Sequence, residues 1–250
     1  MSIEKKPLVN DLYTADPSAH VFNGKIYIYP SHDEDIDVEN NDNGDQYDMK
    51  DYHVYEMPDT ETYPRDCGCV LKLEDIPWAS KQLWAPDCVE KDGKYYFVYP
   101  ARDKEGFFRI GIAIGDKPEG PFKPEPNYIP GSYSIDPCMF PDTDGKYYLT
   151  FGGIWGGQLD QYRNNKWSAD NKEPKGDEEA CTAKIALMKD NLLEMAEEPK
   201  DIMILDENGK HLTGGDEARR YFEDPWMFKK GDTYYFTYST GTTHLLCYAT

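Results

Sequence analysis

The sequence predicts an all-β fold of the β-propeller type, and two observations carry that prediction. One pattern occurs four times along the 250 residues: a carboxylate beside a proline, then a turn with Gly, then a Tyr-rich strand. The segments after each copy are rich in β-branched and aromatic residues, as strands are. A repeat whose copies contain such strand-forming residues is typical of a radial β architecture in which each copy forms one blade.

The repeat also predicts which distant residues meet. Its copies are Ala15-Asp16-Pro17, Pro86-Asp87, Ile135-Asp136-Pro137 and Phe222-Glu223-Asp224-Pro225. Because Pro cannot donate to a central ladder, it belongs where an innermost strand begins, at the mouth of the propeller. Equivalent positions of successive blades converge on one axis, so we expect Asp16, Asp136 and Glu223 to share one pocket.

Strand and turn patterns justify the individual elements in order. The predicted strands are residues 25–29, 94–99, 108–114, 146–151 and 233–238. Asp-Gly pairs at residues 92–93 and 144–145 are typical of hairpin turns. Helical patterns are few, and we expect one short surface helix over residues 189–198.

The last segment, residues 244–250, matches the third strand of a blade, and the chain stops there. A fourth blade would then lack its outer strand, and natural folds avoid such open edges. We therefore expect residues 1–250 to form one propeller domain that is incomplete at its C-terminus.

Two insertions interrupt the repeat. Residues 33–48 are so acidic that a calcium loop has to be considered. Aligning Gly44 as the sixth position of an EF-hand loop puts Lys50 at the twelfth, where a carboxylate is needed. The segment is therefore interpreted as a solvated loop, and residues 160–176 as a polar excursion at the rim.

Composition narrows the function classes. The formal net charge is −20, with 47 acidic and 27 basic residues, which disfavours nucleic acid because phosphates are held by clustered Lys and Arg. No apolar stretch has membrane-spanning length, and residues 1–10 lack the apolar core of a secretion signal. Six cysteines without such a signal predict reduced thiols and a cytoplasmic protein, and Cys67-Gly68-Cys69 has no second pair for zinc.

The blade-start carboxylates are the candidates for chemistry. Three carboxylates around one axis repel one another, which spreads their pKa values so that one is ionised while another keeps its proton. Glycoside hydrolysis requires that division between a base that activates water and an acid that protonates the leaving oxygen. The alternative is that Asp-Pro simply starts a blade, with the Asp capping a turn.

Several segments together resemble glycoside hydrolase family 43, the five-bladed β-propeller enzymes that act on xylan and arabinan side chains. The matching segments are 14–22, 29–33, 84–87, 134–137 and 222–225, with further similarity at 51–55, 76–81 and 151–158 that is typical of a β-xylosidase-like branch. The resemblance implies that about three and a half of five blades are present in this chain.

The same resemblance implies roles for the carboxylates. Asp16 would be the general base, Asp136 would tune and hold the acid, and Glu223 would be the general acid. Inversion follows if the base and acid carboxyls stand roughly 6.5–9.5 Å apart. The predicted activity is removal of xylose or arabinofuranose from short oligosaccharides by a β-xylosidase. The alternatives are an α-L-arabinofuranosidase and a non-catalytic sugar-binding propeller.

Supporting residues follow from the same comparison. Trp84 would be an aromatic platform for the sugar, with a place in the core as the alternative. His32 and Asp33 would bind its hydroxyls, with a loop backbone contact as the alternative for His32. His244 follows the fourth innermost strand as His32 follows the first, which makes it a further candidate for the pocket. Trp155 is interpreted as structural, in a Gly-rich segment near the pocket. No cofactor is required for the chemistry and no metal ligand is assigned here, although the resemblance places a structural Ca²⁺ at the propeller axis of the full-length protein. The predicted partner is an oligosaccharide, with no nucleic acid and no membrane.

Overall fold

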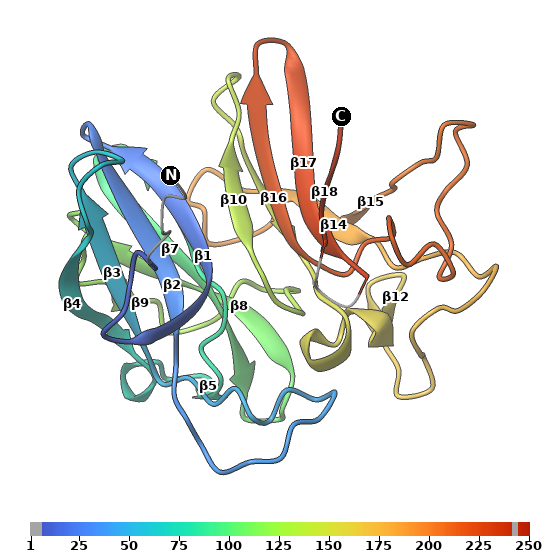
Figure 1. The fold of residues 1–250 in the computed structure, drawn as a ribbon, viewed down its shortest axis with the longest axis horizontal. Helices are drawn as coiled ribbons and strands as arrows, with labels where there is room; N and C mark the ends of the chain where they lie inside the picture. Colours follow the sequence, from blue (N-terminus) through green and yellow to red (C-terminus); the bar gives the residue numbers. More distant parts are fainter. Residues whose placement is uncertain (1–6, 242–244) are drawn as a thin grey trace, which may run out of the picture.

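A computed structural model describes residues 7–241 and 245–250, which form four blade sheets that follow one another in chain order and one separate two-stranded sheet (Figure 1). Each blade is antiparallel, and the innermost strands of neighbouring blades are in contact. The predicted all-β propeller is confirmed, with three blades of four or more strands and one of three.

Three blades are simple meanders, whereas in the second blade the first two strands both pair with the third. The first contains β1 Tyr13–Phe22, β2 Lys25–Asp33, β3 Asp51–Met57 and β4 Arg65–Lys72. The second contains β5 Ala79–Lys81, β6 Asp87–Lys91, β7 Lys94–Asp103, β8 Phe108–Gly115 and β9 Lys123–Pro124. The third contains β10 Cys138–Pro141, β11 Tyr147–Phe151, β14 Ala183–Leu187 and β15 Lys200–Ile202, and the fourth β16 Glu223–Lys230, β17 Thr233–Thr240 and β18 Leu245–Ala249.

Short elements complete the fold. The hairpin of β12 (Tyr162–Arg163) and β13 (Lys166–Trp167) forms part of the polar insertion at residues 160–176. Three 3₁₀ turns are η1 Leu73–Asp75, η2 Trp155–Gly157 and η3 Leu159–Gln161. Within the described residues, no helix is long and apolar enough to cross a membrane.

The predicted strands and both Asp-Gly hairpins are confirmed, but the short helix over residues 189–198 is wrong. That segment is a tight turn closed by the Lys189 N–H, which donates to the Glu194 carbonyl at 2.8 Å. Leu192 at its tip has φ 58° and is fully buried. Burial of this one apolar side chain outweighs the weak helical preference of the charged residues around it.

The fourth carboxylate of the repeat, Asp87, has a structural place. Asp87 is fully buried on β6; its Oδ1 accepts a hydrogen bond from His20 Nε2 on β1 at 2.6 Å. Its Oδ2 accepts the backbone N–H of Met139 on β10 at 2.7 Å. One side chain thus ties the innermost strands of three blades together.

Aromatic side chains fill the spaces between blades. Tyr52 of β3 packs on Phe97 of β7 with ring centroids 4.9 Å apart, and both are fully buried. Tyr133 stacks on Tyr162 at 4.0 Å in the core shared by the second, third and fourth blades. Most of the Tyr-rich repeat is therefore core, which leaves the blade starts to build the site.

Candidate active site

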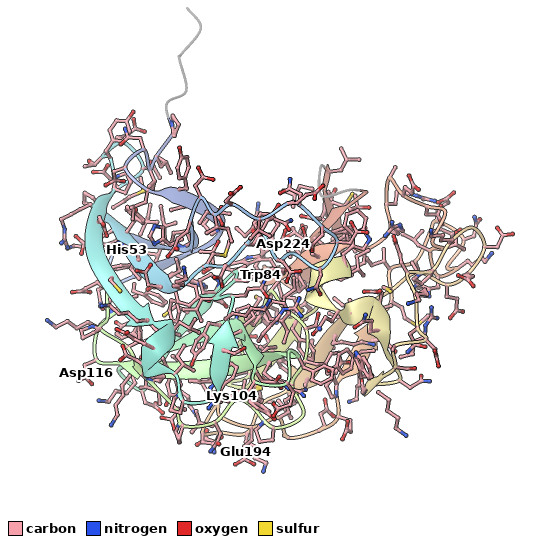
Figure 2. The ribbon with its side chains drawn as sticks, turned by 90° about the horizontal axis from the view of Figure 1, so that it is seen from below. His53, Trp84, Lys104, Asp116, Glu194 and Asp224 are labelled. Atoms are coloured by element: carbon pink, nitrogen blue, oxygen red, sulfur yellow. The ribbon has the colours of Figure 1, made fainter. Side chains whose placement is uncertain are left out.

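One pocket of about 570 Å³ opens where the four blades meet, a volume suited to a small ligand. Figure 2 labels Trp84 and Asp224, which border it near the middle of the molecule. Its lining comes from the start of each blade, from the end of β2, from the acidic insertion after β2 and from η2. The polar and aromatic lining residues are Asp16, Ser31, Asp33, Asn41, Asp42, Gln46, Tyr47, Trp84, Asp136, Trp155, Phe222, Glu223, Asp224 and Ser239.

A strained backbone turns three equivalent aspartates toward the axis. Asp16, Asp136 and Asp224 each precede a proline and have φ of 45°, 54° and 56°. The β1–β2 register breaks between Ala15 and Ser18, and the β16–β17 register breaks in the same way after Glu223. A left-handed φ costs on the order of 1–3 kcal/mol outside glycine, and such strain concentrates at functional sites.

Crowding of carboxylates shifts their proton affinities. Although Asp16 is open to the pocket, surrounding protein raises its pKa to about 7, and the charges of Asp224 and Asp33 add to the effect. Burial raises the pKa of Asp136 well above its usual range, and Asp224, Glu223 and Asp16 raise it further. Burial also raises the pKa of Glu223 well above its usual range, with added contributions from Asp224 and Asp16. The site therefore holds protons at neutral pH that isolated carboxylates would have lost.

Hydrogen bonds fix two of these groups and leave another free. The Asp136 Oδ2 accepts the backbone N–H of Asp224 at 3.2 Å, and Ser239 Oγ donates to Asp224 Oδ2 at 2.9 Å. These two bonds tie Asp136 to the start of β16 and the Asp224 side chain to β17. In contrast, Asp33 Oδ1 is buried without a hydrogen-bond partner from the protein. A buried acceptor of this kind suits a hydroxyl group of a ligand.

Five of the seven residues that the sequence singled out line this pocket: Asp16, Asp33, Trp84, Asp136 and Glu223. His32 does not line it, because successive residues of β2 face opposite sides of the sheet and Ser31 and Asp33 take the pocket side. The hydroxyl-binding role predicted for His32 at this pocket is therefore not supported. His244 lies outside the described residues.

Trp84 is fixed in the pocket wall by its neighbours. Its indole N–H donates to the Tyr47 carbonyl at 2.8 Å, and its ring lies 4.6 Å from that of Phe108. A Cβ atom on Gly44 would lie 2.5 Å from the Trp84 ring, and one on Gly156 would lie 2.9 Å away. Only glycine fits at these two close approaches, so they determine how the indole sits.

The acidic insertion is more than a solvated loop. Its residues Asn41, Asp42, Gly44, Gln46 and Tyr47 form one wall of the pocket. The wall is anchored from beneath by buried Arg102 of β7, which donates to the Asn43 carbonyl at 2.8 Å. The same guanidinium donates to the Gly156 carbonyl at 3.1 Å, and Gly156 lies directly beside Asn43.

Among the pocket residues that the sequence interpretation missed are Asp224 and Trp155. Asp224 stands at the same place in its blade as Asp16 and Asp136, and its Asp-Pro pair carried the signal that would have identified it. Trp155 was interpreted as structural but borders the pocket, with φ 57° and its indole N–H on Glu173 Oε2 at 3.0 Å.

The axial calcium implied by the resemblance can be tested against the residues at the axis. Carboxylate oxygens are suitable ligands for Ca²⁺, and Asp16, Asp136 and Asp224 also border a channel of about 290 Å³ on the axis. Among the residues that the structure describes, these three carboxylates do not approach closely enough to form a three-ligand cluster. They do not hold a cation by themselves, and the axial calcium stays a prediction.

A propeller whose axial pocket gathers buried carboxylates with raised pKa values and aromatic walls has the features of a glycoside hydrolase. The sequence profile of glycosyl hydrolases family 43 matches residues 5–249, and the chain belongs to that family of glycosidases. A xylosidase/arabinosidase of Bacteroides ovatus is 56% identical over 251 residues, covering 100% of this chain and 77% of the relative.

Two further comparisons agree with this assignment. Xylosidase/arabinosidase 43A of Humicola insolens is 57% identical over 250 residues, covering 96% of this chain and 76% of the relative. The crystal structure of CoXyl43, a β-xylosidase/α-arabinofuranosidase from a compost microbial metagenome, was solved with xylotriose in a calcium-free form. It matches with a TM-score of 0.94 at 54% identity, covering 98% of this chain and 75% of that one.

Proposed function

We propose that this chain hydrolyses the bond to a terminal xylose or arabinofuranose in xylo- and arabino-oligosaccharides, with inversion, and acts chiefly as a β-xylosidase. The observation that carries the proposal is the convergence of Asp16, Asp136 and Glu223 on one pocket. The names of the similar proteins, which are xylosidases and arabinosidases, support the choice of sugars.

Asp16 is the proposed general base. Its pKa of about 7 makes it a proton acceptor matched to neutral solution, and its carboxylate is open to water in the pocket. In this mechanism one Asp16 oxygen takes a proton from a water molecule while that water attacks the anomeric carbon. The product sugar then has the opposite anomeric configuration.

Glu223 is the proposed general acid. Burial raises the pKa of its carboxyl well above the usual range, which favours the protonated form that can give its proton to the glycosidic oxygen as the bond breaks. The charges of Asp224 and Asp16 raise the pKa of Glu223 further. Asp224 therefore takes part in the tuning of the acid, a role that the family resemblance implied for Asp136. Asp136, which accepts the N–H of Asp224, would hold the start of β16 and hence Glu223 in place.

Stereochemistry tests this proposal directly. Proton NMR during hydrolysis of 4-nitrophenyl β-xyloside should show α-xylose as the first product, with β-xylose appearing only by later mutarotation. Initial release of β-xylose would contradict the roles of Asp16 and Glu223, because retention needs a nucleophile in place of a base.

An α-L-arabinofuranosidase is the second candidate, because the similar proteins carry both activities in their names. Rates on 4-nitrophenyl α-arabinofuranoside and β-xyloside under identical conditions distinguish the two. A non-catalytic sugar-binding propeller is disfavoured, since sugar binding alone has no need of a cluster of carboxylates with raised pKa values. Sugar binding by a folded protein that hydrolyses neither substrate would favour it.

A further inference from the structure

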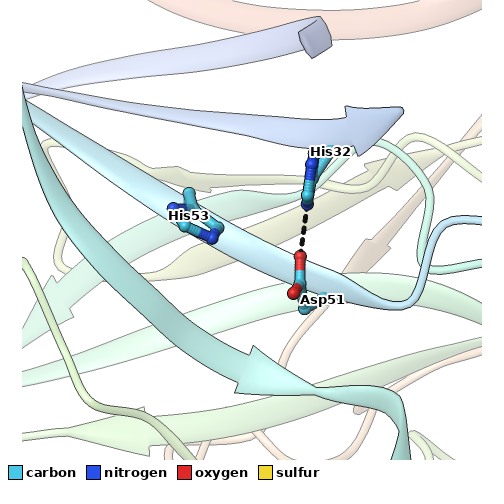
Figure 3. Close-up of side chains that lie close together, drawn as sticks. All are labelled: His32, Asp51 and His53. Atoms are coloured by element: carbon cyan, nitrogen blue, oxygen red, sulfur yellow. Dashed lines mark hydrogen bonds and ion pairs between the residues drawn. The ribbon is translucent and has the colours of Figure 1, made fainter. Parts of the chain in front are cut away.

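The first blade carries two imidazoles and a carboxylate that the proposed hydrolysis does not use. His32 lies on the face of β2 opposite to the pocket-lining Ser31 and Asp33. Asp51 and His53 are two residues apart on β3 and so share one face. Figure 3 shows the three side chains together, and each offers a ligand atom within 4.8 Å of the others.

Strand register explains why they meet. Ile28 pairs with Tyr55 in the antiparallel β2–β3 ladder, and extending that register by four residues brings His32 opposite Asp51. His32 Nδ1 lies 2.5 Å from Asp51 Oδ1, and the rings of His32 and His53 have centroids 5.4 Å apart. The three side chains are 17–26% exposed, so solvent reaches them while the sheet fixes their positions.

A second carboxylate orients His53. Both oxygens of Asp66 on β4 lie 3.0–3.1 Å from His53 Nδ1, and Asp66 Oδ1 is itself fixed by the Gly68 N–H at 2.6 Å. Because this carboxylate occupies Nδ1, the other ring nitrogen, Nε2, is the one that can bind a metal. Metal-binding histidines in proteins are held in this way by a carboxylate behind the ring.

We propose that His32, Asp51 and His53 bind one transition-metal ion of the Zn²⁺ class, with water as the fourth ligand and Asp66 as a positioning residue. Two imidazoles and one carboxylate suit Zn²⁺, Co²⁺ or Ni²⁺, whereas Ca²⁺ and Mg²⁺ prefer sites made of oxygen alone. On binding, the metal replaces the direct contact between His32 Nδ1 and Asp51 Oδ1 with a bond to each of the two atoms. The site links the end of β2, next to Asp33, to β3.

Isothermal titration calorimetry of the EDTA-treated chain with ZnCl₂ tests the proposal. One Zn²⁺ should bind per chain. His32→Gln and His53→Gln should each weaken the affinity at least about 100-fold, and Asp66→Asn about 10–100-fold. CaCl₂ and MgCl₂ should not compete.

His211→Gln is the matched control, because it removes a half-buried imidazole from a distant part of the fold. It should leave Zn²⁺ affinity unchanged. Absence of one-to-one binding, or equal binding by the wild type and His53→Gln, would overturn the proposal.

A spectroscopic measurement on the unmutated chain guards against variants that fail to fold. Titration with CoCl₂ should give the visible d–d bands of a four-coordinate nitrogen and oxygen site. Only the weak spectrum of six-coordinate cobalt, or a thiolate charge-transfer band from a cysteine, would place the ion elsewhere and overturn the assignment.

Discussion

Arg102 is expected to hold the sugar-binding pocket in shape. It is 3% exposed and carries its charge without a carboxylate in contact, and burial lowers its pKa. Its guanidinium donates to Gln82 Oε1 at 2.5 Å and to the carbonyls of Gly106, Asn43 and Gly156 at 2.9, 2.8 and 3.1 Å. Through these bonds one side chain fixes both the acidic insertion and the turn that carries Trp155.

Replacing Arg102 by Met leaves three carbonyl acceptors without their donor, at a cost of about 1–3 kcal/mol each where water cannot enter. Removing a desolvated charge offsets part of that loss. We therefore expect Arg102→Met to lower the free energy of unfolding by about 3 kcal/mol, which for a chain of this length lowers Tm by about 6–12 °C.

The assay combines thermal unfolding with initial rates on xylobiose. Because Arg102 supports the pocket wall and touches no carboxylate of the proposed chemistry, KM should rise about 10-fold while kcat falls less. Arg163→Met is the control, since Arg163 is exposed and donates only to the Lys172 carbonyl at 3.0 Å. A Tm and KM for Arg102→Met equal to those of the control would refute the reasoning.

Three other predictions follow from the same packing. Gly44→Ala places a Cβ atom 2.5 Å from the Trp84 ring at φ +72°, so it should raise KM by a larger factor than it changes kcat. The control Gly209→Ala has a similar φ of +76° but open space around the added Cβ atom, so it should leave KM and kcat unchanged. Asp87→Ala unpairs His20 and the Met139 N–H and should cost about 3 kcal/mol by thermal unfolding, against no change for the exposed Asp232→Ala. Asp136 has a raised pKa in the folded state, so the native protein binds its proton more tightly than the unfolded chain, and this contribution to stability is lost as pH rises above about 4. Asp136→Asn should therefore exceed the wild type in Tm by at least about 3 °C at pH 7.5 and by less at pH 4.5; equal differences at both pH values would contradict this.

The repeat predicted much of the fold and the site because its information is local. Tyr-rich strands, Asp-Gly hairpins and blade-start prolines act over a few residues, and rotational equivalence then brings Asp16, Asp136 and Glu223 together. The sequence could also have predicted the face of the strand on which His32 lies. Side chains alternate along a strand, so His32 faces away from the pocket if its neighbour Asp33 faces into it.

The rest depends on contacts between distant segments. Nothing near Asn43 indicates that the acidic loop is anchored by Arg102, because the partners are 59 residues apart and meet only in the folded chain. Asp87 resembles the other blade-start carboxylates in sequence, but its proline precedes it. Because of this reversal, Asp87 lies two positions nearer to its hairpin turn than Asp16 does in the first blade, and in that position it meets His20. The turn at residues 189–198 depends on burial of Leu192, which is not a local property either.

The central claim is that Glu223 gives the proton and Asp16 takes one, and leaving-group dependence tests it most directly. We predict that Glu223→Gln lowers kcat/KM on xylobiose about 10²–10⁴-fold. Its effect on 4-nitrophenyl β-xyloside should be much smaller, because nitrophenolate leaves without being protonated. Asp16→Asn should lower both rates alike, since water must be activated in each case. Equal losses on both substrates for Glu223→Gln, or wild-type rates in either variant, would contradict the account.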